Sequence, residues 1–266
     1  MSDPATQDRL CAKGLTLAFG SRVIQRDLSF SVRQGSIFAV MGGSGCGKST
    51  VMRAIMGLTR PAAGTVLVDN EDFWAADARR RTEISRRFGV LFQNGALWSS
   101  MTVAENVALP LEMFTRLDSG EIAALVRLKL SLLGLSAAGE RMPAELSGGM
   151  RKRAGLARAL ALDPDVLFLD EPSAGLDPIT SKRLDDLIVE LRDGLGATIV
   201  MVSHELPSLF AICDDGIFLD AESRTAIAHG APSVLRDTCD HPTVRAFMLR
   251  ERTDAPTAME AAHGRG

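Results

Sequence analysis

Residues 41–50 read Met41-Gly42-Gly43-Ser44-Gly45-Cys46-Gly47-Lys48-Ser49-Thr50, and they carry the motif from which the fold of the chain is inferred. It fits the pattern G-x-x-x-x-G-K-[ST], in which a glycine-rich turn surrounds a phosphate with backbone N–H groups. We expect Gly43, Gly45 and Gly47 to take positive φ and to let the backbone approach the phosphate. Lys48 is then placed to reach the β and γ phosphates, and Ser49 to bind Mg²⁺. The stretch therefore predicts a nucleotide site at residues 42–50.

The surroundings of this stretch match the structure that a phosphate loop needs. Residues 36–41 form a short apolar run that predicts a buried strand, and residues 48–56 predict a helix that ends at Gly57. The positive end of that helix adds to the anion site. A glycine-rich turn with a chance lysine is the alternative, and the succession of strand, loop and helix disfavours it.

Composition narrows the class of protein. The 266 residues are 46% hydrophobic, which suffices for the core of one large domain or two modest ones. The formal net charge of −3 argues against a nucleic-acid partner. No apolar run is long enough to span a membrane, and the start lacks a signal-peptide layout, so we expect a cytoplasmic protein. The four cysteines form no C-x-x-C pair, which disfavours a disulfide or zinc site.

The chain around the loop predicts further strands and two candidate ligand residues. Alternating runs at 15–19 and 28–32 predict antiparallel strands beside the loop, and 65–70 and 88–92 predict two more strands. Phe19 could stack on a purine base, although its spacing alone favours a buried strand aromatic. The arginines of residues 79–87 indicate the solvated face of a helix. Gln93 follows the strand at 88–92, where ligand-contacting residues collect.

Residues from about 94 to 160 predict helices inserted between core strands. Thr102 and Glu105 form a capping box, and an apolar pattern predicts a helix at 119–133. Ser147-Gly148-Gly149 precedes a basic helix and makes a second anion site at a helix N-terminus. It is either an ordinary cap or a site for a nucleotide held by a partner copy.

Carboxylates end the next strand, at residues 166–171. Asp170 and Glu171 follow four apolar residues, and because side chains alternate along a strand the two acids face different ways. One can hold the water shell of a metal while the other faces an attacking water. Burial would raise a carboxylate pKa, which suits a general base.

The last third of the chain predicts a turn, three strands and several helices. Pro178 opens a helix that runs to residue 193, and the strand at 198–202 ends near His204. His204 could contact a γ-phosphate, but a helix cap or structural donor is the commoner role of such a histidine. Strands at 216–219 and 225–229 and terminal helices follow. Residues 252–266 predict a disordered tail.

Taken together, these motifs resemble the ATP-binding subunits of ABC transporters over residues 10–250. Residues 42–49 resemble Walker A, Gln93 the Q-loop, 146–150 the signature motif, 166–171 Walker B, 173–177 the D-loop and His204 the H-loop. The resemblance implies an α/β fold: a P-loop NTPase core with a parallel sheet, an antiparallel β subdomain and an inserted α-helical subdomain. It places the ATP-binding domain at residues 1–252 and the tail at 253–266.

The resemblance also implies roles for the site residues. Such subunits form homodimers that hold two ATP molecules, each between Walker A of one copy and the signature of the other. Ser147, Gly148, Gly149 and Asp177 would then complete the ATP site of the partner, and Phe19 falls at the position of the adenine-stacking aromatic. Glu171 would polarise the attacking water and His204 would hold the γ-phosphate. The residues implied at the Mg²⁺ are Ser49, Gln93 and Asp170.

A finer resemblance is to the ATPases of Mla/Mce lipid transporters (MlaF-like). Residues 91–98 and 176–180 carry it, together with Met150 in place of the usual signature glutamine. It implies a multispanning permease, an MCE lipid-binding protein and a possible STAS-domain subunit as partners. The cargo would be phospholipid or another hydrophobic lipid, and the chain would lie on the cytoplasmic face of the inner membrane.

Three other functions are weighed against lipid transport. The first is an ATPase subunit of another ABC importer, for example one for amino acids. The second is an ABC-type ATPase acting on ribosomes or DNA, which usually carries two motif sets or a long coiled coil. The third, a small-molecule kinase, leaves the signature motif unexplained. One residue gives a chemical test: Cys46 lies in the loop, so thiol alkylation is predicted to block ATP binding, with ATP protecting.

Overall fold

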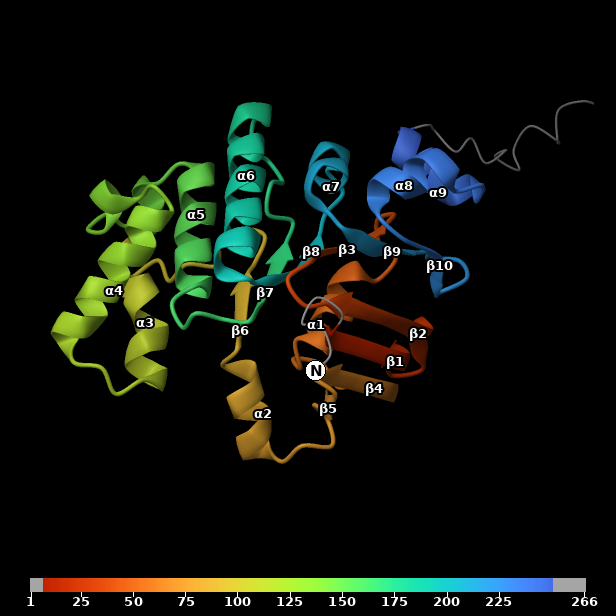
Figure 1. Cartoon of the computed structure of the whole chain (residues 1–266), viewed down its shortest axis with the longest axis horizontal. Helices are drawn as coiled ribbons and strands as arrows, with labels where there is room; N and C mark the ends of the chain where they lie inside the picture. The colour runs from red at the N-terminus through yellow and green to blue at the C-terminus, as the bar shows by residue number, and fades with distance from the viewer. Residues whose placement is uncertain (1–6, 251–266) are drawn as a thin grey trace, which may run out of the picture.

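Two β-sheets organise the computed structural model, which describes residues 7–250 (Figure 1). The antiparallel sheet has the strand order β2-β1-β4-β5. Its strands are β1 (Asp8–Phe19), β2 (Arg22–Arg33), β4 (Ala63–Val68) and β5 (Glu71–Asp72). The second sheet has the order β10-β9-β3-β8-β7-β6. Its strands are β3 (Ile37–Gly42), β6 (Phe88–Leu91), β7 (Val166–Asp170), β8 (Thr198–Val202), β9 (Asp215–Leu219) and β10 (Ala226–His229).

The central strands of the six-stranded sheet, β9, β3, β8 and β7, are buried on both faces. Strands β9, β3, β8, β7 and β6 pair in parallel, and β10 closes the edge in antiparallel pairing with β9. Along β3, Ala39 and Met41 pack into one hydrophobic core, whereas Phe38 and Val40 pack into the other. This alternation is the period of two that a strand imposes, and it explains why the strands read as continuous apolar runs.

Helices cover the two faces of that sheet. The helices of the described chain are α1 (Lys48–Ile55), α2 (Ala78–Ser85), α3 (Val103–Phe114), α4 (Ser119–Leu132), α5 (Gly148–Ala159), α6 (Pro178–Leu195), α7 (Leu206–Ile212), α8 (Pro232–Thr238) and α9 (Pro242–Leu249), with short 3₁₀ turns η2 (Ser136–Ala138) and η3 (Pro143–Glu145). Figure 1 shows α5, α6 and α7 on one face, and α1 with the antiparallel sheet on the other.

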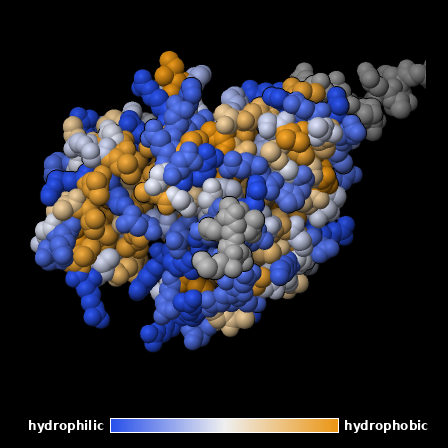
Figure 2. All heavy atoms as spheres, viewed as in Figure 1, coloured by the Kyte–Doolittle hydropathy of each residue, from blue (hydrophilic) through white to orange (hydrophobic). Residues whose placement is uncertain are grey.

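The chain between β6 and β7 forms a group of packed helices. Helix α3 contacts both α4 and α5, and α5 packs on β6. The predicted capping box at Thr102 and Glu105 is confirmed, and α4 has a second one at Asp118 and Glu121. Each box satisfies backbone N–H groups that the first helical turn leaves free. Figure 2 shows apolar side chains gathered over α3 and α4, at the left of the view.

Several predicted elements have different limits in the structure. Strands β1 and β2 are twelve residues each, longer than the five-residue runs predicted, because register shifts interrupt their alternation. The arginine cluster is not uniformly solvated, which corrects the sequence interpretation. Arg87 pairs with Asp69 and, through Nε, with Asp165 at 2.5 Å, so it joins the two sheets. Sequence spacing shows none of these partners. The predicted tail lies outside the described residues.

No helix within residues 7–250 has the length and apolar character needed to cross a membrane.

Candidate nucleotide site

The predicted site residues meet at one edge of the six-stranded sheet. Strands β3, β6, β7 and β8 run parallel, so their carboxyl ends lie side by side. The phosphate loop follows β3, Gln93 follows β6, Asp170 and Glu171 end β7, and His204 follows β8. The register pairs Asp170 with Val202, which brings the acids next to the histidine loop. Residues far apart in the chain thus meet at one edge of the sheet.

Glycine is required at two points of the phosphate loop. Gly42 has φ 140°, and a Cβ there would lie 2.3 Å from the Leu219 carbonyl oxygen. Gly47 has φ 100°, and its Cβ would lie 2.7 Å from Cγ2 of Ile24. The prediction of positive φ at Gly43 is wrong, because the left-handed residues are Gly42, Gly45 and Gly47. The turn therefore begins one residue earlier, where β9 packs against the loop.

Lys48 and its neighbours are arranged around this turn. The Lys48 ammonium donates to the carbonyl oxygens of Gly42 and Gly43, at 2.9 Å each, and so lies over the loop. Ser49 is exposed and Thr50 half-buried, whereas Ser44 and Gly45 face solvent. An ammonium, an exposed hydroxyl and a turn of N–H groups can together bind a polyphosphate.

The buried side chains of Cys46 and Gln25 lie beneath the phosphate loop. Cys46 is 2% exposed, and burial raises the pKa of its thiol. Gln25 is fully buried, and its Nε2 donates to the Cys46 carbonyl oxygen at 2.6 Å and to that of Asp220 at 3.1 Å. The sequence-based expectation that Cys46 is alkylated is therefore corrected, since its Sγ is buried beneath the turn, 4.0 Å from the Lys48 ammonium, and is closed to solvent. Sequence reasoning missed Gln25, because Arg26 and Asp27 follow it in β2 and nothing in the sequence marks the glutamine as buried.

The two acids at the end of β7 have different environments. Burial and the neighbouring Glu171 raise the pKa of Asp170, while Arg53 and Lys48 act in the opposite direction. Glu171 adopts φ 51°, a left-handed conformation unusual for a glutamate. Its Oε1 lies 2.8 Å from Nδ1 of His204. The N-cap of α7 is Glu205, so the helix-cap alternative for His204 does not hold.

Phe19 and Gln93 are both exposed. Phe19 is 56% exposed at the end of β1, so it is not the buried aromatic that its spacing alone favours. Gln93 lies in the loop after β6, beside the partly exposed Phe92. An exposed ring can stack on a base, and an exposed amide can bind a ligand or a metal-bound water.

The second anion site lies on another surface of the chain. Ser147 caps α5 by accepting from the Met150 N–H at 3.2 Å, and Asp177 caps α6 by accepting from Ile179 and Thr180. Those hydrogen bonds, with Thr180 first, lower the pKa of Asp177. Ser147 and Asp177 line one hollow of about 540 Å³, together with Gly148 and Gly149, and no residue of the phosphate loop lines it. Helices α5 and α1 lie on opposite faces of the sheet. A single chain therefore does not bring Ser147 to its own loop.

This arrangement of loop, acids and separate serine motif agrees with the comparisons to known proteins. Residues 25–174 match the family model described as "ABC transporter". The chain belongs to this family. As a member, it binds ATP and hydrolyses it as the ATPase subunit of a transporter, on the α/β fold of an ABC ATPase.

Two curated relatives and one solved structure show how similar this chain is to known proteins. The chain is 39% identical to the probable ribonucleotide transport ATP-binding protein Mkl of Mycobacterium leprae, over 94% of this chain and 74% of Mkl. It is 43% identical to the intermembrane phospholipid transport system ATP-binding protein MlaF of Escherichia coli, over 86% and 84%. A dimeric post-hydrolysis structure of the ATP-binding cassette MJ0796, bound to ADP and Pi, superimposes with TM-score 0.76 at 28% identity, over 84% and 98%.

Proposed function

We propose that this chain powers the transport of phospholipid or another hydrophobic lipid across a bacterial envelope, through a separate permease. The observation that carries the proposal is the 43% identity to MlaF over most of both chains. Met150 in the signature supports it, because that residue carries the resemblance to lipid-transporter ATPases. The name of Mkl points to one competing function, ribonucleotide transport.

ATP binding begins at the phosphate loop in this proposal. Lys48 leaves the carbonyl oxygens of Gly42 and Gly43, which hold it at 2.9 Å, and turns to the β and γ phosphates. Residues 42–50 supply N–H donors, and Phe19 stacks on the adenine. A base on an aromatic ring is worth about 1–3 kcal/mol in nucleic-acid systems.

The donor set around Asp170 fits Mg²⁺. Asp170 offers a carboxylate, and the exposed Ser49 and Gln93 offer neutral oxygens. No group of three or more His, Cys, Asp or Glu residues that could hold a metal occurs within residues 7–250. Mg²⁺ typically takes one or two carboxylates together with substrate phosphates, which this donor set allows. The bound ion would neutralise charge on the phosphates.

Hydrolysis is assigned to Glu171 with His204. Glu171 accepts the proton of the attacking water, and its carboxylate is held 2.8 Å from Nδ1 of His204. The other ring nitrogen of His204, Nε2, lies 3.7 Å from Oε1 of Glu205 and would turn from it to the γ-phosphate, since the histidine is half exposed. Gln93 contacts the water and the metal from the β6 edge.

Two copies complete the site. Ser147, Gly148 and Gly149 form a helix N-terminus that does not reach the phosphate loop of the same chain. Placed over the loop of a second copy, that N-terminus would bind the γ-phosphate of the partner's ATP. Asp177 lies in the same hollow and would approach the same nucleotide.

A groove beside Gln93 offers the permease contact. It has a volume of about 460 Å³, and Phe92, Trp98, Phe114 and Arg86 are among its lining residues. Trp98 is 59% exposed, and Phe114 is stacked under the Arg86 guanidinium. Because the groove begins at Phe92, next to Gln93, we propose that a short helix from a cytoplasmic loop of the permease binds in it. Movement there would reach the metal edge through Gln93.

The remaining partners follow from the lipid-transport proposal. An MCE lipid-binding protein would exchange lipid with the permease, and a small STAS-domain subunit would accompany the ATPase. The chain would lie on the cytoplasmic face of the inner membrane, held through the permease.

Affinity purification from detergent-solubilised membranes tests the function. We expect the tagged full chain to bring down a permease and an MCE protein, and phospholipid to stimulate the ATPase of the complex. Trp98→Ala should lose the permease while keeping ATP binding, whereas Leu195→Ala, at an exposed apolar residue on α6, should keep both. Stimulation only by a ribonucleotide, or by an amino-acid-, sugar- or metal-binding protein, would refute lipid transport. Salt-sensitive association with ribosomes or DNA would favour the other ATPase class.

A further inference from the structure

Lys152 is a buried cation on the signature helix α5. It is 6% exposed, and Lys129 is the other buried lysine within residues 7–250. Burial lowers the pKa of its ammonium, and the Glu171 charge opposes that shift. A buried ammonium is retained only where it is well hydrogen-bonded. The contacts of Lys152 therefore indicate what it does.

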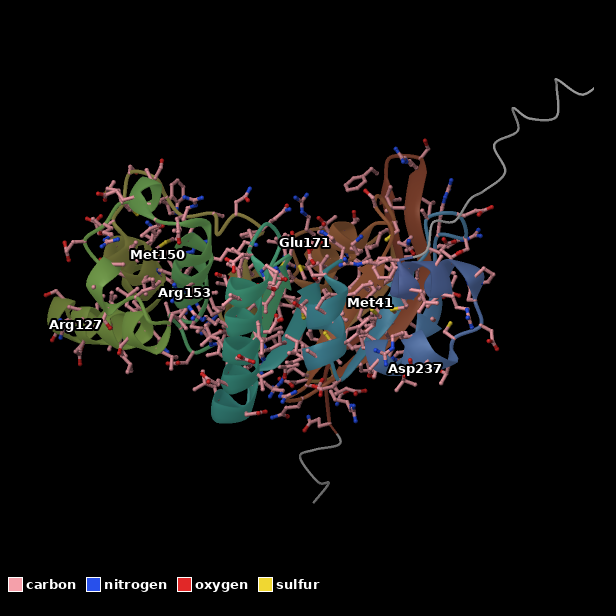
Figure 3. All side chains as sticks on the ribbon, turned by 90° about the horizontal axis from the view of Figure 1, so that it is seen from above. Met41, Arg127, Met150, Arg153, Glu171 and Asp237 are labelled. Carbon is pink, nitrogen blue, oxygen red and sulfur yellow. The ribbon has the colours of Figure 1, made fainter. Side chains whose placement is uncertain are left out.

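Those contacts join α5 to the turn after β7. The Lys152 ammonium donates to the backbone carbonyl oxygen of Glu171 at 2.9 Å and to that of Ala174 at 2.7 Å. The Ala174 N–H donates to the same Glu171 carbonyl oxygen at 3.3 Å and closes a short turn. The Lys152 side chain therefore binds both ends of this turn. In Figure 3, Glu171 lies between Met150 of α5 and Met41 of β3.

The turn that Lys152 binds is strained. Glu171 has φ 51°, a conformation that costs a residue with a side chain about 1 kcal/mol or more and persists only when its surroundings enforce it. The Glu171 N–H donates to the Val202 carbonyl oxygen at 2.9 Å, and the Glu171 carbonyl oxygen accepts from the Lys152 ammonium. The backbone of Glu171 is thus held on both sides, which fixes the direction of its carboxylate.

We propose that Lys152 is a positioning residue that couples the signature motif to Glu171 of the same chain. The inference rests on the proposed role of Glu171 and on the shared site between two copies. In that dimer, the N-terminus of α5 faces the partner's nucleotide, while Glu171 faces the chain's own. A shift of α5 on ATP closure is therefore transmitted by Lys152 to the catalytic carboxylate of the other site.

Lys152→Met in the full-length chain tests this coupling. The ammonium is lost and the turn after Glu171 is released, so we expect kcat for ATP hydrolysis to fall by about tenfold or more. KM should change by less than about threefold, because the phosphate loop is untouched. The Hill coefficient for ATP should fall toward one. Lys152→Arg, which keeps a charged donor, should recover most of the lost kcat.

Lys129→Met is the matched control. Lys129 is equally buried but pairs with Asp163 in the helical group, away from the nucleotide edge. Loss of this buried ammonium should lower stability while leaving kcat per folded molecule within about twofold of the parent. An equal fall of kcat in Lys129→Met and Lys152→Met would overturn the positioning role.

A Glu171→Gln background separates ATP-dependent dimerisation from hydrolysis. The double variant should form ATP-dependent dimers as readily as Glu171→Gln alone, since Lys152 acts on the carboxylate and not on ATP binding. Loss of those dimers would overturn the proposal. Normal turnover by Glu171→Gln itself would instead refute the proposed base, so the two failures are distinguishable.

Discussion

Glu171 shows how a single residue combines backbone strain with a placed carboxylate. Its left-handed φ turns the chain sharply after β7, and the side chain then meets His204 at 2.8 Å. Asp170, one residue earlier, points to the Lys48 and Arg53 side of the strand, and these cations oppose the burial that raises its pKa. Strand alternation and one strained dihedral thus place the two acids in different surroundings.

Glu171→Gln is expected to bind ATP and hydrolyse it at least about a hundredfold more slowly, because the amide cannot accept the proton of the water. With ATP and Mg²⁺ the variant should accumulate as a dimer. Size-exclusion chromatography and phosphate release measure the two effects. As a control, Glu112→Gln alters an exposed carboxylate on α3, outside both the phosphate-loop edge and the Ser147 hollow, and should turn over normally. Normal turnover by Glu171→Gln contradicts the assignment of the base.

Cys46 is expected to resist alkylation in the folded protein. Burial raises the pKa of its thiol, so the reactive thiolate forms only at a higher pH than in an ordinary cysteine. Labelling with iodoacetamide, read by mass spectrometry, should therefore be slowest at Cys46 and Cys213 and fastest at the partly exposed Cys11 and Cys239. The rate at Cys46 should rise as the pH is raised. If Cys46 is instead labelled rapidly at neutral pH, and ATP slows that labelling, the sequence-based expectation of an accessible thiol holds.

At the scale of elements, α6 and α7 connect the two loops that lie on either side of Glu171. Helix α6 begins after the turn at Asp177, and α7 begins after His204. The buried Asp185 of α6 accepts from the Ser208 hydroxyl of α7 at 2.7 Å, while its other oxygen is buried without a partner. The contact fixes the two helices to each other through a carboxylate that is poorly solvated.

Asp185→Asn is expected to stabilise the fold at neutral pH. Burial raises the pKa of Asp185 in the folded state above that in the unfolded state. The folded state therefore binds the proton more tightly, and this group's contribution to stability is lost as the pH rises through its folded pKa. Each unit of such a shift is worth about 1.4 kcal/mol. Asparagine does not ionise, so the variant avoids this loss of stability. Its amide oxygen can still accept the hydrogen bond from the Ser208 hydroxyl.

Urea unfolding of both proteins at several pH values measures this effect. The difference in free energy of unfolding should be on the order of 1 kcal/mol at neutral pH and should vanish near pH 4. Asp186→Asn, at the exposed neighbour, should show little difference at either pH. A stability difference that does not change with pH would contradict the account.

At the scale of the whole molecule, the chain holds two half sites on separate surfaces. The phosphate loop lies on the side of α1 and the antiparallel sheet, and Ser147 lies on the opposite side of the six-stranded sheet. In the proposed dimer, the loop of one copy would meet the serine of the other, and symmetry would repeat the site.

Mixing two inactive variants tests this shared site. Lys48→Ala disables the loop and Ser147→Arg blocks the serine motif, so each variant alone should be inactive. A mixed dimer contains one site with both changes and one site with neither. Equal mixing should restore about a quarter of the parent's ATPase activity, because half of the dimers are mixed and each has one intact site.

The control for the mixing experiment is Lys48→Ala combined with a chain that carries both changes. That mixture contains the same substitutions but no intact loop, and it should remain inactive. If differently tagged chains form mixed dimers and no activity returns, the two surfaces do not share a nucleotide.

Most of the strands and helices, and most of the candidate site residues, could be predicted from the sequence alone. The loop at 42–50, the acids at 170–171, Gln93 and His204 are local signals, because each lies at the end of an apolar run whose period predicts a strand. Parallel strands bring their carboxyl ends to one edge, so the shared location of these residues was predictable as well.

The residues that support the candidate site could be found only from the way distant segments pack. Gln25 beneath Cys46, Lys152 on the Glu171 carbonyl oxygen and Arg87 between two aspartates all act through partners 18 or more residues away. The sequence signal at each was only a polar or charged residue, which most often means a solvated surface. Their roles arise from burial and hydrogen bonding to backbone or carboxylate groups, and those depend on how distant segments pack.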